Sequence, residues 1–329
     1  MTRAALFDRM ANPVTDFVDV LRKSIVQGSP AVVFVNSQAG AGRAGRYVLQ
    51  IRRVFEAAKI PAEFVLTETS ADLEAKAQAA IASGSRFLLA MGGDGTFQGL
   101  ANAAFGSDVL LGVLPAGGGN DFAAALGLPK DPVAAARAVL RGRPRCVDLL
   151  RARTGDGGER LYVGGGGVGL DVAALRYAAG VYRRLPGRLR YVASALRAWR
   201  EFTPLNVRAE FPGSDLPTMG TNVLLAGVLN VPTYGAGLRV APGAKMDDCR
   251  LNLSLVRNLS VLEVMRLVPR LLHRGTLPDA YLQQRQARRV LLSTDRQCFF
   301  HGDGEILGPT PAEVEVVPCA MKVLAPGAW

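Results

Sequence analysis

Four turns of this chain carry the residue types that could do chemistry. Three are glycine-rich and follow apolar runs: one after Asn36, one in LLAMGGDGTFQGL and one in GVLPAGGGNDFAAALGLP. The fourth is the acidic turn of FFHGDGEIL. Glycine lets the backbone approach a phosphate closely, and the N–H groups that open a helix point at an anion. The three glycine-rich turns therefore predict sites for phosphate.

The first turn admits two interpretations. Gly40, Gly42 and Gly45 satisfy G-x-G-x-x-G, the dinucleotide fingerprint, and Glu63 lies near the distance expected of a ribose-binding acid. In that fold, however, the strand runs almost directly into the first glycine, whereas residues 36–39 intervene here. Dinucleotide and other phosphate ligands both stay open at this turn.

The second turn is more specific because it places an aspartate among glycines. Asp94 would repel a phosphate directly, so it predicts Mg²⁺ between the two anions or a hydrogen bond from a ligand hydroxyl. The alternative is a helix cap at an ordinary strand–turn–helix junction. The predicted ligand-binding residues of this turn are Gly92, Gly93, Asp94, Gly95 and Thr96.

The third turn repeats this arrangement, with Asn120 and Asp121 opening a helix. Two glycine-rich turns with an aspartate each predict a triphosphate-and-metal cleft at the carboxyl ends of neighbouring strands. The candidate residues of the third turn are Gly117, Gly119, Asn120 and Asp121.

The acidic turn contains Asp303 and Glu305 between two predicted strands. Asp-Gly is common in hairpin turns, which is one interpretation. The functional one makes Asp303 a general base that takes the proton from a hydroxyl as it attacks the γ-phosphorus. For the neighbouring His301, a packing or surface role is favoured.

The elements that must position these turns change in character along the chain. Residues 31–142 alternate strand-like and helix-like stretches, which predicts a doubly wound, mostly parallel sheet. One helix is predicted from a Ser70 cap to Gly84. Beyond about residue 143, short strands divided by Gly, Pro and Asp predict an antiparallel sandwich or barrel. These strands are predicted at 146–153, 160–169, 206–211, 221–230, 238–244, 249–256, 288–294, 298–305 and 312–318, with helices at 174–201 and 261–272.

The composition indicates a soluble protein with an anionic partner. Basic residues number 39 and acidic residues 28, a net charge of +11, which favours a nucleotide, a nucleic acid or an anionic membrane unless it only aids solubility. Aromatic residues make up 7% with no basic–aromatic interleaving, so no nucleic-acid partner is expected. Without a secretory leader or an apolar run that could span a bilayer, we expect a cytoplasmic location and four reduced cysteines.

The motifs of several well-known enzyme classes are absent from the sequence. The sequence has no G-x-x-x-x-G-K-[ST] loop, no H-R-D or D-F-G and no G-x-S-x-G. P-loop nucleotidases, protein kinases and α/β-hydrolases are therefore excluded.

Taken together, the turns resemble the diacylglycerol kinase catalytic family, lipid kinases whose fold is shared with NAD kinase. The matching stretches are N-x-x-A-G-x-G-R-x-G from Asn36, G-G-D-G-T from Gly92, P-A-G-G-G-N-D-F-A from Pro115, Y-G-A-G-L-R-V-A-P-G-A from Tyr234 and D-G-E from Asp303. The resemblance implies transfer of the γ-phosphate of ATP, with Mg²⁺, to a hydroxyl of diacylglycerol or a related lipid. Alternatives are a NAD kinase-like enzyme and a non-catalytic nucleotide- or lipid-binding regulator; a dinucleotide oxidoreductase is the weakest.

The resemblance also assigns roles and boundaries. Asn36, Gly40 and Gly42 would contact nucleotide phosphates, Asp303 would be the base, and Glu305 would support metal or geometry. The implied organisation has an extension at 1–28, a nucleotide-binding α/β domain at 29–143 plus about 317–329, and a β-rich lipid-binding domain at 144–316.

Three departures from the family pattern suggest reduced activity or a shifted substrate. Gly118 stands where threonine is usual. KMDDCRLNL resembles a D-D-G-x-L metal site but has Cys249 in place of the glycine, which leaves Asp248 as the candidate ligand of a structural Mg²⁺. The run from Gly164 to Gly167 lacks the usual asparagine.

Contact with the lipid surface is predicted from residues 176–200, where arginines mix with apolar side chains. Each basic side chain near anionic lipid is worth about 1 kcal/mol, so this stretch predicts a peripheral membrane contact, with a solvated helix face as the alternative. An amphipathic helix at 14–27 is a second candidate, for which docking or a homodimer contact is an equal alternative.

Overall fold

The computed structural model describes residues 29–327 except 43, 183–184, 186, 236, 261, 264–265, 268–269 and 271–276. The predicted helix at 14–27 lies outside the described residues, as does most of the one predicted at 261–272. Within the described part of the chain, no helix combines the length and apolar character needed to cross a membrane.

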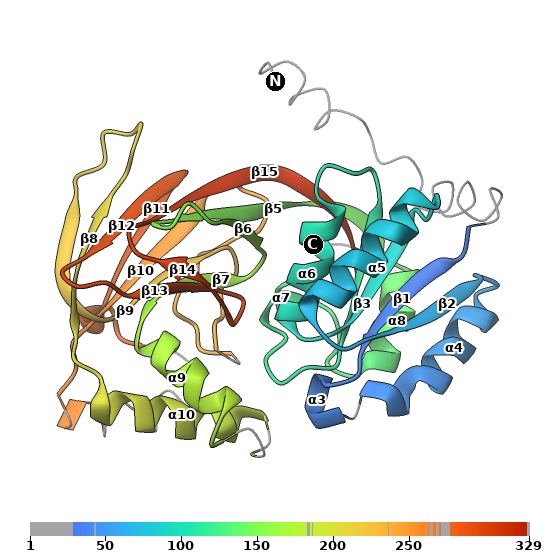
Figure 1. Ribbon diagram of the computed structural model, residues 1–329, viewed down its shortest axis with the longest axis horizontal. Helices are drawn as coiled ribbons and strands as arrows, with labels where there is room; N and C mark the ends of the chain where they lie inside the picture. Colours follow the sequence, from blue (N-terminus) through green and yellow to red (C-terminus); the bar gives the residue numbers. More distant parts are fainter. Residues whose placement is uncertain are drawn as a thin grey trace.

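The first part of the fold, the α/β part, has the parallel strands that were predicted, and their order is β4-β3-β1-β2 (Figure 1). Helix α4 packs with α8, and α5 with α6, in two separate pairs. The strands are β1 (Ala31–Asn36), β2 (Ala62–Thr67), β3 (Phe87–Gly92) and β4 (Leu110–Pro115). The helices are α3 (Ala39–Gly42), η1 (Ala44–Tyr47), α4 (Val48–Ala57), α5 (Ser70–Ala82), α6 (Asp94–Ala104), α7 (Asp121–Ala125) and α8 (Pro132–Leu140).

Local sequence explains where these elements begin. Every residue of β3 and β4 is buried, which suits strands covered on both faces. The prediction of Ser70 as a cap is wrong by one residue: the Thr69 hydroxyl accepts the Asp72 N–H at 3.1 Å, because Thr69 has the extended backbone that a cap requires. At α8, Asp131 caps the helix as its side chain accepts the Ala134 N–H at 2.7 Å.

The second part, the β-rich part, is an antiparallel, sandwich-like arrangement as predicted. Its main strand order is β14-β13-β7-β9-β8-β12, with β10 pairing to β9 and β11 to β10. The strands are β6 (Glu159–Tyr162), β7 (Gly165–Gly169), β8 (Leu205–Glu210), β9 (Met219–Leu229), β10 (Leu251–Arg257), β11 (Leu282–Ala287), β12 (Arg289–Thr294), β13 (Phe299–Gly302) and β14 (Glu305–Pro309). The remaining elements are helices α9 (Leu170–Ala179) and α10 (Gly187–Glu201) and the short η2 (Asp279–Tyr281).

Four local predictions in this part are wrong. The strand predicted at 160–169 is interrupted between β6 and β7, and the helix predicted at 174–201 is two helices separated after Ala179. Residues 238–244 form no strand but a bend held by one bridge between Tyr234 and Leu238, because a Pro-Gly turn follows directly. Strand β11 was missed because its sequence, LQQRQA, is polar in its middle four positions, which are exposed.

Two long strands, β5 (Arg143–Thr154) and β15 (Ala312–Ala325), run antiparallel through both parts and link them (Figure 1). One end of β15 pairs with β12, and the other pairs in parallel with β4. The register between β5 and β15 shifts between Val317 and Met321, where the pair passes from one part to the other.

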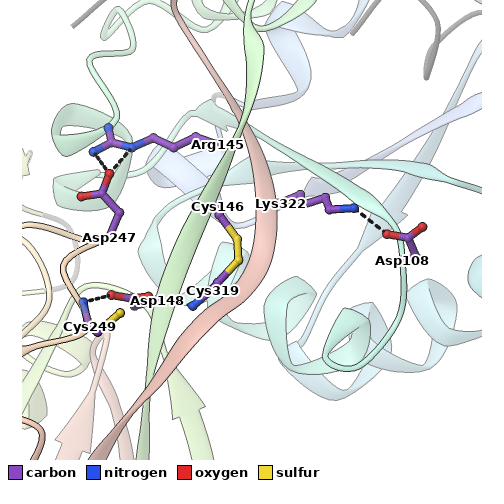
Figure 2. The surroundings of a disulfide bond; sticks show 8 residues. All are labelled: Asp108, Arg145, Cys146, Asp148, Asp247, Cys249, Cys319 and Lys322. Atoms are coloured by element: carbon purple, nitrogen blue, oxygen red, sulfur yellow. Dashed lines mark hydrogen bonds and ion pairs between the residues drawn. A yellow bond between two sulfur atoms is a disulfide. The ribbon is translucent and has the colours of Figure 1, made fainter. Parts of the chain in front are cut away.

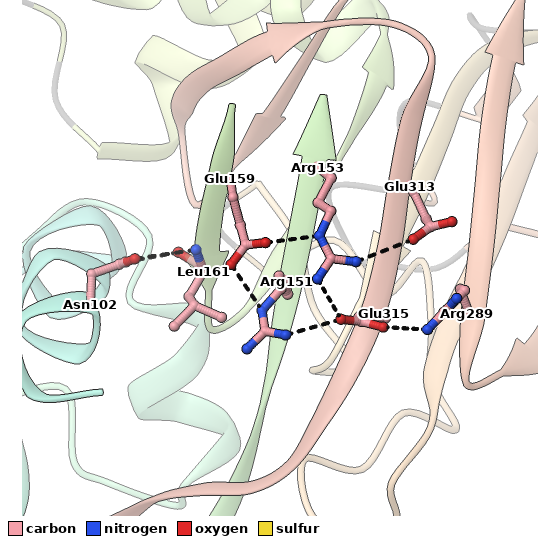
Figure 3. Close-up of polar contacts among 8 residues, drawn as sticks. All are labelled: Asn102, Arg151, Arg153, Glu159, Leu161, Arg289, Glu313 and Glu315. Carbon is pink, nitrogen blue, oxygen red and sulfur yellow. Dashed lines mark hydrogen bonds and ion pairs between the residues drawn. The ribbon is translucent and has the colours of Figure 1, made fainter. Parts of the chain in front are cut away.

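An ion-pair network crosses the β-rich ends of these strands (Figure 3). The Glu315 carboxylate of β15 forms ion pairs with Arg151 of β5 at 3.1 Å and with Arg289 of β12 at 2.7 Å. Arg153 and Glu159 extend the network toward β6. Burial alone would raise the pKa of Glu315, but the charges and hydrogen bonds of Arg153, Arg151 and Arg289 outweigh it and hold that pKa below the usual value.

The prediction of four reduced cysteines is wrong for two of them. Cys146 of β5 and Cys319 of β15 form a disulfide with Cα atoms 5.0 Å apart (Figure 2). They are 173 residues apart in the sequence, and only the antiparallel pairing of β5 with β15 brings them together. Cys249 and Cys298 are free.

Candidate active site

The second and third glycine-rich turns lie against each other at the carboxyl ends of β3 and β4. A Cβ atom on Gly117 would lie 2.5 Å from the Gly93 Cα, so no side chain fits there. The Gly92 carbonyl accepts the N–H groups of Ala116 and Gly117 at 2.8 and 3.1 Å. The structure thus brings two turns together as bare backbone, which is the surface that a phosphate group needs.

Asn36 joins this surface from β1. Its Nδ2 donates to the Thr96 hydroxyl at 2.9 Å, and the Thr96 side chain in turn folds over Gly92, where a Cβ would lie 2.2 Å from the hydroxyl oxygen. The side chains of Asn36 and Thr96 therefore pack against the backbone of Gly92 at the base of the second turn.

The first turn has a different backbone from the others. Gly40 and Gly42 adopt φ values of 60° and 78°, which favour glycine, and they lie in the short helix α3. A Cβ on Gly42 would meet only the Ser37 carbonyl, at 3.9 Å. Gly40 and Gly42 follow the β1 end that carries Asn36, and their phosphate contact stays a prediction.

Asp94 links the second turn to the third. Its carboxylate accepts the N–H of Asp121 at 3.1 Å and that of Phe122 at 3.0 Å, which are the first two amides of α7. Burial and the charge of Asp121 raise the pKa of Asp94 to about 6, against the effect of these amides. Asp94 thus caps a helix, which is close to the helix-cap interpretation of its turn. The helix that it caps is α7, and not α6, on which Asp94 itself lies.

The remaining third-turn residues are placed by Asn120. With φ 58°, this residue adopts the left-handed conformation that asparagine tolerates, and its side chain both accepts from and donates to the Gly117 backbone at 3.0 Å. Gly119 and Asp121 lie half-buried beside it, and Gly118 is exposed. The ring of Phe122 stacks on Phe97 at 4.8 Å and fixes α7 below the turn.

Asp303 occupies a cage of backbone amides. Its Oδ2 accepts the Val163 N–H at 2.6 Å, and its Oδ1 accepts those of Gly164 and Gly165 at 2.8 and 3.1 Å. Asp303 itself adopts φ 48°, and its own N–H donates to the Gly165 carbonyl at 2.9 Å. A loop between β6 and β7 therefore holds the carboxylate in one position.

The cage explains the glycine run that departs from the family pattern. A Cβ on Gly164 would lie 3.0 Å from the Asp303 carboxylate, and Cβ atoms on Gly166 and Gly167 would lie 2.3 and 2.4 Å from carbonyl oxygens of β13 and β9. The strand must lack side chains here because the backbones on both sides approach too closely.

The acidic turn faces the second glycine turn. A Cβ on Gly95 would lie 3.5 Å from the Asp303 carbonyl and 3.8 Å from the Glu305 carboxylate. Burial raises the pKa of Asp303 to about 7, with the charge of Asp94 adding to the rise and the cage amides opposing it. Burial also raises the pKa of Glu305, and Arg160, which pairs with Glu74, opposes that rise. The residues predicted as base and nucleotide loop are thus neighbours.

Sequence reasoning missed a buried polar group next to this turn. Asp171 of α9, Tyr234 and His301 of β13 contact one another through their side chains. Tyr234 belongs to the Y-G-A-G stretch, and His301 lies two positions before the first residue of D-G-E. Nothing in the sequence indicated that they meet.

Asp248, the predicted ligand of a structural Mg²⁺, lies in the segment before β10, and its carboxylate accepts the Arg250 N–H at 3.0 Å. Nearby, the buried carboxylate of Asp148 accepts the N–H groups of Cys249 and Cys319, both at 2.7 Å. Cys249 adopts φ 58°, a conformation that explains why glycine is usual at this position.

In the part of the chain that the structure describes, the acidic groups form no preassembled metal site. Across the described ranges, no three His, Cys, Asp or Glu side chains are grouped so that they could hold a metal ion. Both oxygens of Asp94 and of Asp303 already accept backbone N–H groups. The metal roles of Asp94 and Asp248 stay predictions.

Family comparison gives the same picture as the geometry. The model of the diacylglycerol kinase catalytic domain matches residues 30–152, and that of the YegS C-terminal NAD kinase beta sandwich-like domain matches residues 166–325. A diacylglycerol kinase of Mycobacterium tuberculosis is 30% identical over 249 residues, which cover 75% of this chain and 79% of the relative. The chain belongs to the diacylglycerol kinase catalytic-domain family.

Other relatives of this family member agree with that assignment. A protein described as a probable YegS-like lipid kinase, from Chromohalobacter salexigens, is 30% identical over 259 residues, covering 76% of this chain and 79% of the relative.

Solved structures share the fold. A diacylglycerol kinase structure from Bacillus anthracis superposes with a TM-score of 0.68 at 18% identity, covering 90% of this chain and 97% of that one. A second structure from that organism gives a TM-score of 0.72 at 20% identity, with coverage of 90% and 95%.

Proposed function

We propose that the protein transfers the γ-phosphate of ATP to a hydroxyl of diacylglycerol or a related lipid, with Asp303 as general base. The observation that carries this proposal is the Asp303 carboxylate, held in an amide cage beside Gly95 of the glycine turn. Family membership supports a lipid kinase, and the geometry supports the assignment of the base.

The cage suits a base that works near neutral pH. A carboxylate offers about four lone-pair positions, and the three cage amides occupy two on Oδ1 and one on Oδ2. One position on Oδ2 is left to accept the proton of a lipid hydroxyl. With a pKa of about 7, Asp303 is ionised in about half of the molecules at neutral pH, which suits proton transfer at that pH.

The glycine turns fit the phosphates of a nucleotide. Gly93 and Gly117 are in backbone contact, and α6 opens beside them, so amides and not side chains would face an anion. ATP would supply the phosphoryl group, and Asn36 and Thr96 would hold the turns in place. Asp94 would orient α7 rather than contact phosphate. We propose that Mg²⁺ arrives with the nucleotide, since the carboxylates of the described residues form no chelating group.

Membrane contact is proposed for α9 and α10. Val181, between the two helices, is 80% exposed, and Leu196 of α10 is 43% exposed. Arg197 pairs with Glu201 at 2.8 Å, which reduces the charge available for anionic lipid. Sedimentation with anionic vesicles and with neutral vesicles would test the contact; equal binding to both would contradict a role for the basic residues.

The function is tested by incubating the purified protein with radiolabelled ATP, Mg²⁺ and diacylglycerol in mixed micelles. We expect labelled phosphatidic acid, and Asp303→Asn should lower kcat by about 10²- to 10⁴-fold, the usual contribution of general base catalysis. ATP affinity, measured by calorimetry, should change little. Asp295→Asn is the matched control, because its carboxylate also accepts a backbone N–H, from Asn206, but lies in another turn.

A parallel incubation supplies NAD as acceptor. Labelled NADP without labelled lipid would contradict the lipid kinase in favour of a NAD kinase-like enzyme. Nucleotide binding without transfer to any lipid would favour a regulator.

A further inference from the structure

A buried polar triad lies beside the Asp303 turn. The Tyr234 hydroxyl donates to Asp171 Oδ2 at 2.7 Å, and His301 Nε2 lies 2.7 Å from the same oxygen. The Tyr234 hydroxyl and His301 Nε2 also touch each other. Two side chains, one from the segment after β9 and one from β13, thus converge on one carboxylate oxygen of α9.

Burial fixes the arrangement of hydrogens in this triad. His301 is 1% exposed, and its Nδ1 is buried with no hydrogen-bond partner. A carboxylate only accepts, so the His301 proton that it receives must sit on Nε2. The unpartnered Nδ1 then carries a lone pair and no hydrogen. Burying an unpaired lone pair costs less free energy than burying an N–H group without an acceptor.

Two triad members lie on the two sides of the amide cage, His301 through its backbone and Tyr234 through its ring. His301 pairs with Gly167 and Gly302 with Gly166, which fixes β13 against β7 directly before Asp303. The ring of Tyr234 covers Gly165, where a Cβ would lie 3.0 Å from its Cδ2 atom. Gly165 is the residue that exchanges two hydrogen bonds with Asp303.

We propose that Asp171, Tyr234 and His301 form a positioning triad that holds the amide cage closed on Asp303. The proposal rests on the function proposed above, in which Asp303 is the base. The triad touches neither reactant; it acts by keeping the cage amides directed at the carboxylate.

A loosened cage would change the pKa of Asp303, whereas a simple loss of folded protein would not. The cage amides stabilise the ionised form of Asp303, so weakening them raises its pKa. The titratable groups that face Asp303 are Asp94 of α6, Tyr162 of β6 and Tyr234 itself. Removing the Tyr234 hydroxyl leaves the charge at Asp94 in place, so a shift would report the cage.

The test compares Tyr234→Phe and Asp171→Asn with the wild-type protein between pH 5.5 and 9. Tyr234→Phe keeps the ring on Gly165 and removes one hydroxyl. We expect the acid limb of the kcat profile to move up by about 1 pH unit, since loss of one cage hydrogen bond to the charged Asp303 carboxylate is worth at least that much. Activity should fall about tenfold at pH 6 and change little at pH 9, with the KM for ATP unaltered.

Thr294→Val is the matched control, an isosteric loss of a hydroxyl whose partners are Thr310 and Arg296. It should leave the pH profile in place. The same midpoint is also read without substrates, from the pH dependence of the urea unfolding free energy. A uniform loss of activity across pH, or an unshifted unfolding profile in both triad variants, would overturn the triad proposal. A wild-type protein that phosphorylates no lipid would refute the proposed function instead, and the unfolding profile would still decide the triad.

Discussion

The raised pKa of Asp303 makes the stability of the protein depend on pH in an unusual direction. Aspartate has a pKa near 3.8 in the unfolded chain and about 7 in the folded cage. Between these values the folded protein keeps a proton that the unfolded chain has lost. Stability contributed by Asp303 is therefore full below about pH 4, falls as pH rises and is lost above about pH 7.

The size of this effect follows from the shift itself. From pH 5 to the folded pKa of about 7 there are two units, at about 1.36 kcal/mol each, so the contribution of Asp303 to the free energy of unfolding should fall by about 2.7 kcal/mol between pH 5 and 8. Asparagine does not titrate. In Asp303→Asn this fall should vanish, and the unpaired cage amides should add only an offset that is independent of pH.

Urea unfolding at pH 5, 6, 7 and 8, without nucleotide, measures both proteins. The difference between their unfolding free energies should change by about 2.7 kcal/mol over this range, while Asp94 titrates in both. Parallel pH profiles for wild type and variant would refute the reasoning, because they would mean that Asp303 has an ordinary pKa in the fold.

Three further predictions concern the glycine run of β7, the second glycine-rich turn and the disulfide. Gly166→Ala should cost more than about 2 kcal/mol of stability, because its Cβ would lie 2.3 Å from a carbonyl of β13; Gly45→Ala, with open space around it, should cost little in the same denaturation assay. Thr96→Val should weaken ATP binding about 2- to 10-fold in calorimetry, since it removes the acceptor for Asn36; unchanged affinity would contradict a role for this bond. Reduction of the Cys146–Cys319 disulfide should lower the free energy of unfolding by about 2–5 kcal/mol, and a Cys146→Ser variant should not respond to the reductant.

Much of the α/β part was predictable because its signals are local. Strands β1 and β3 are apolar runs ending in a polar turn or in glycine, and a cap and a proline mark the start of α8. The neighbourhood of Asp94 and Asp121 follows from parallel strands sharing one sheet edge. Such features need only nearby residues and a fold class.

The rest could not be predicted because it depends on pairing between distant segments. The disulfide requires the register of β5 with β15. The cage around Asp303 needs the amides of residues 163–165, about 140 positions earlier, and backbone amides leave no sign in a sequence. The triad joins Asp171 to His301 by the same kind of long-range contact.

The position of β15 in the chain also bears on synthesis. Its partner β4 is complete at residue 115, yet the pairing residues Lys322 and Val323 leave the ribosome some 200 residues later. Until then one flank of β4, an apolar strand that is fully buried in the native protein, has no hydrogen-bonding neighbour. The nascent protein therefore carries an open strand edge through most of translation, when it is most exposed to wrong pairing and most dependent on chaperones.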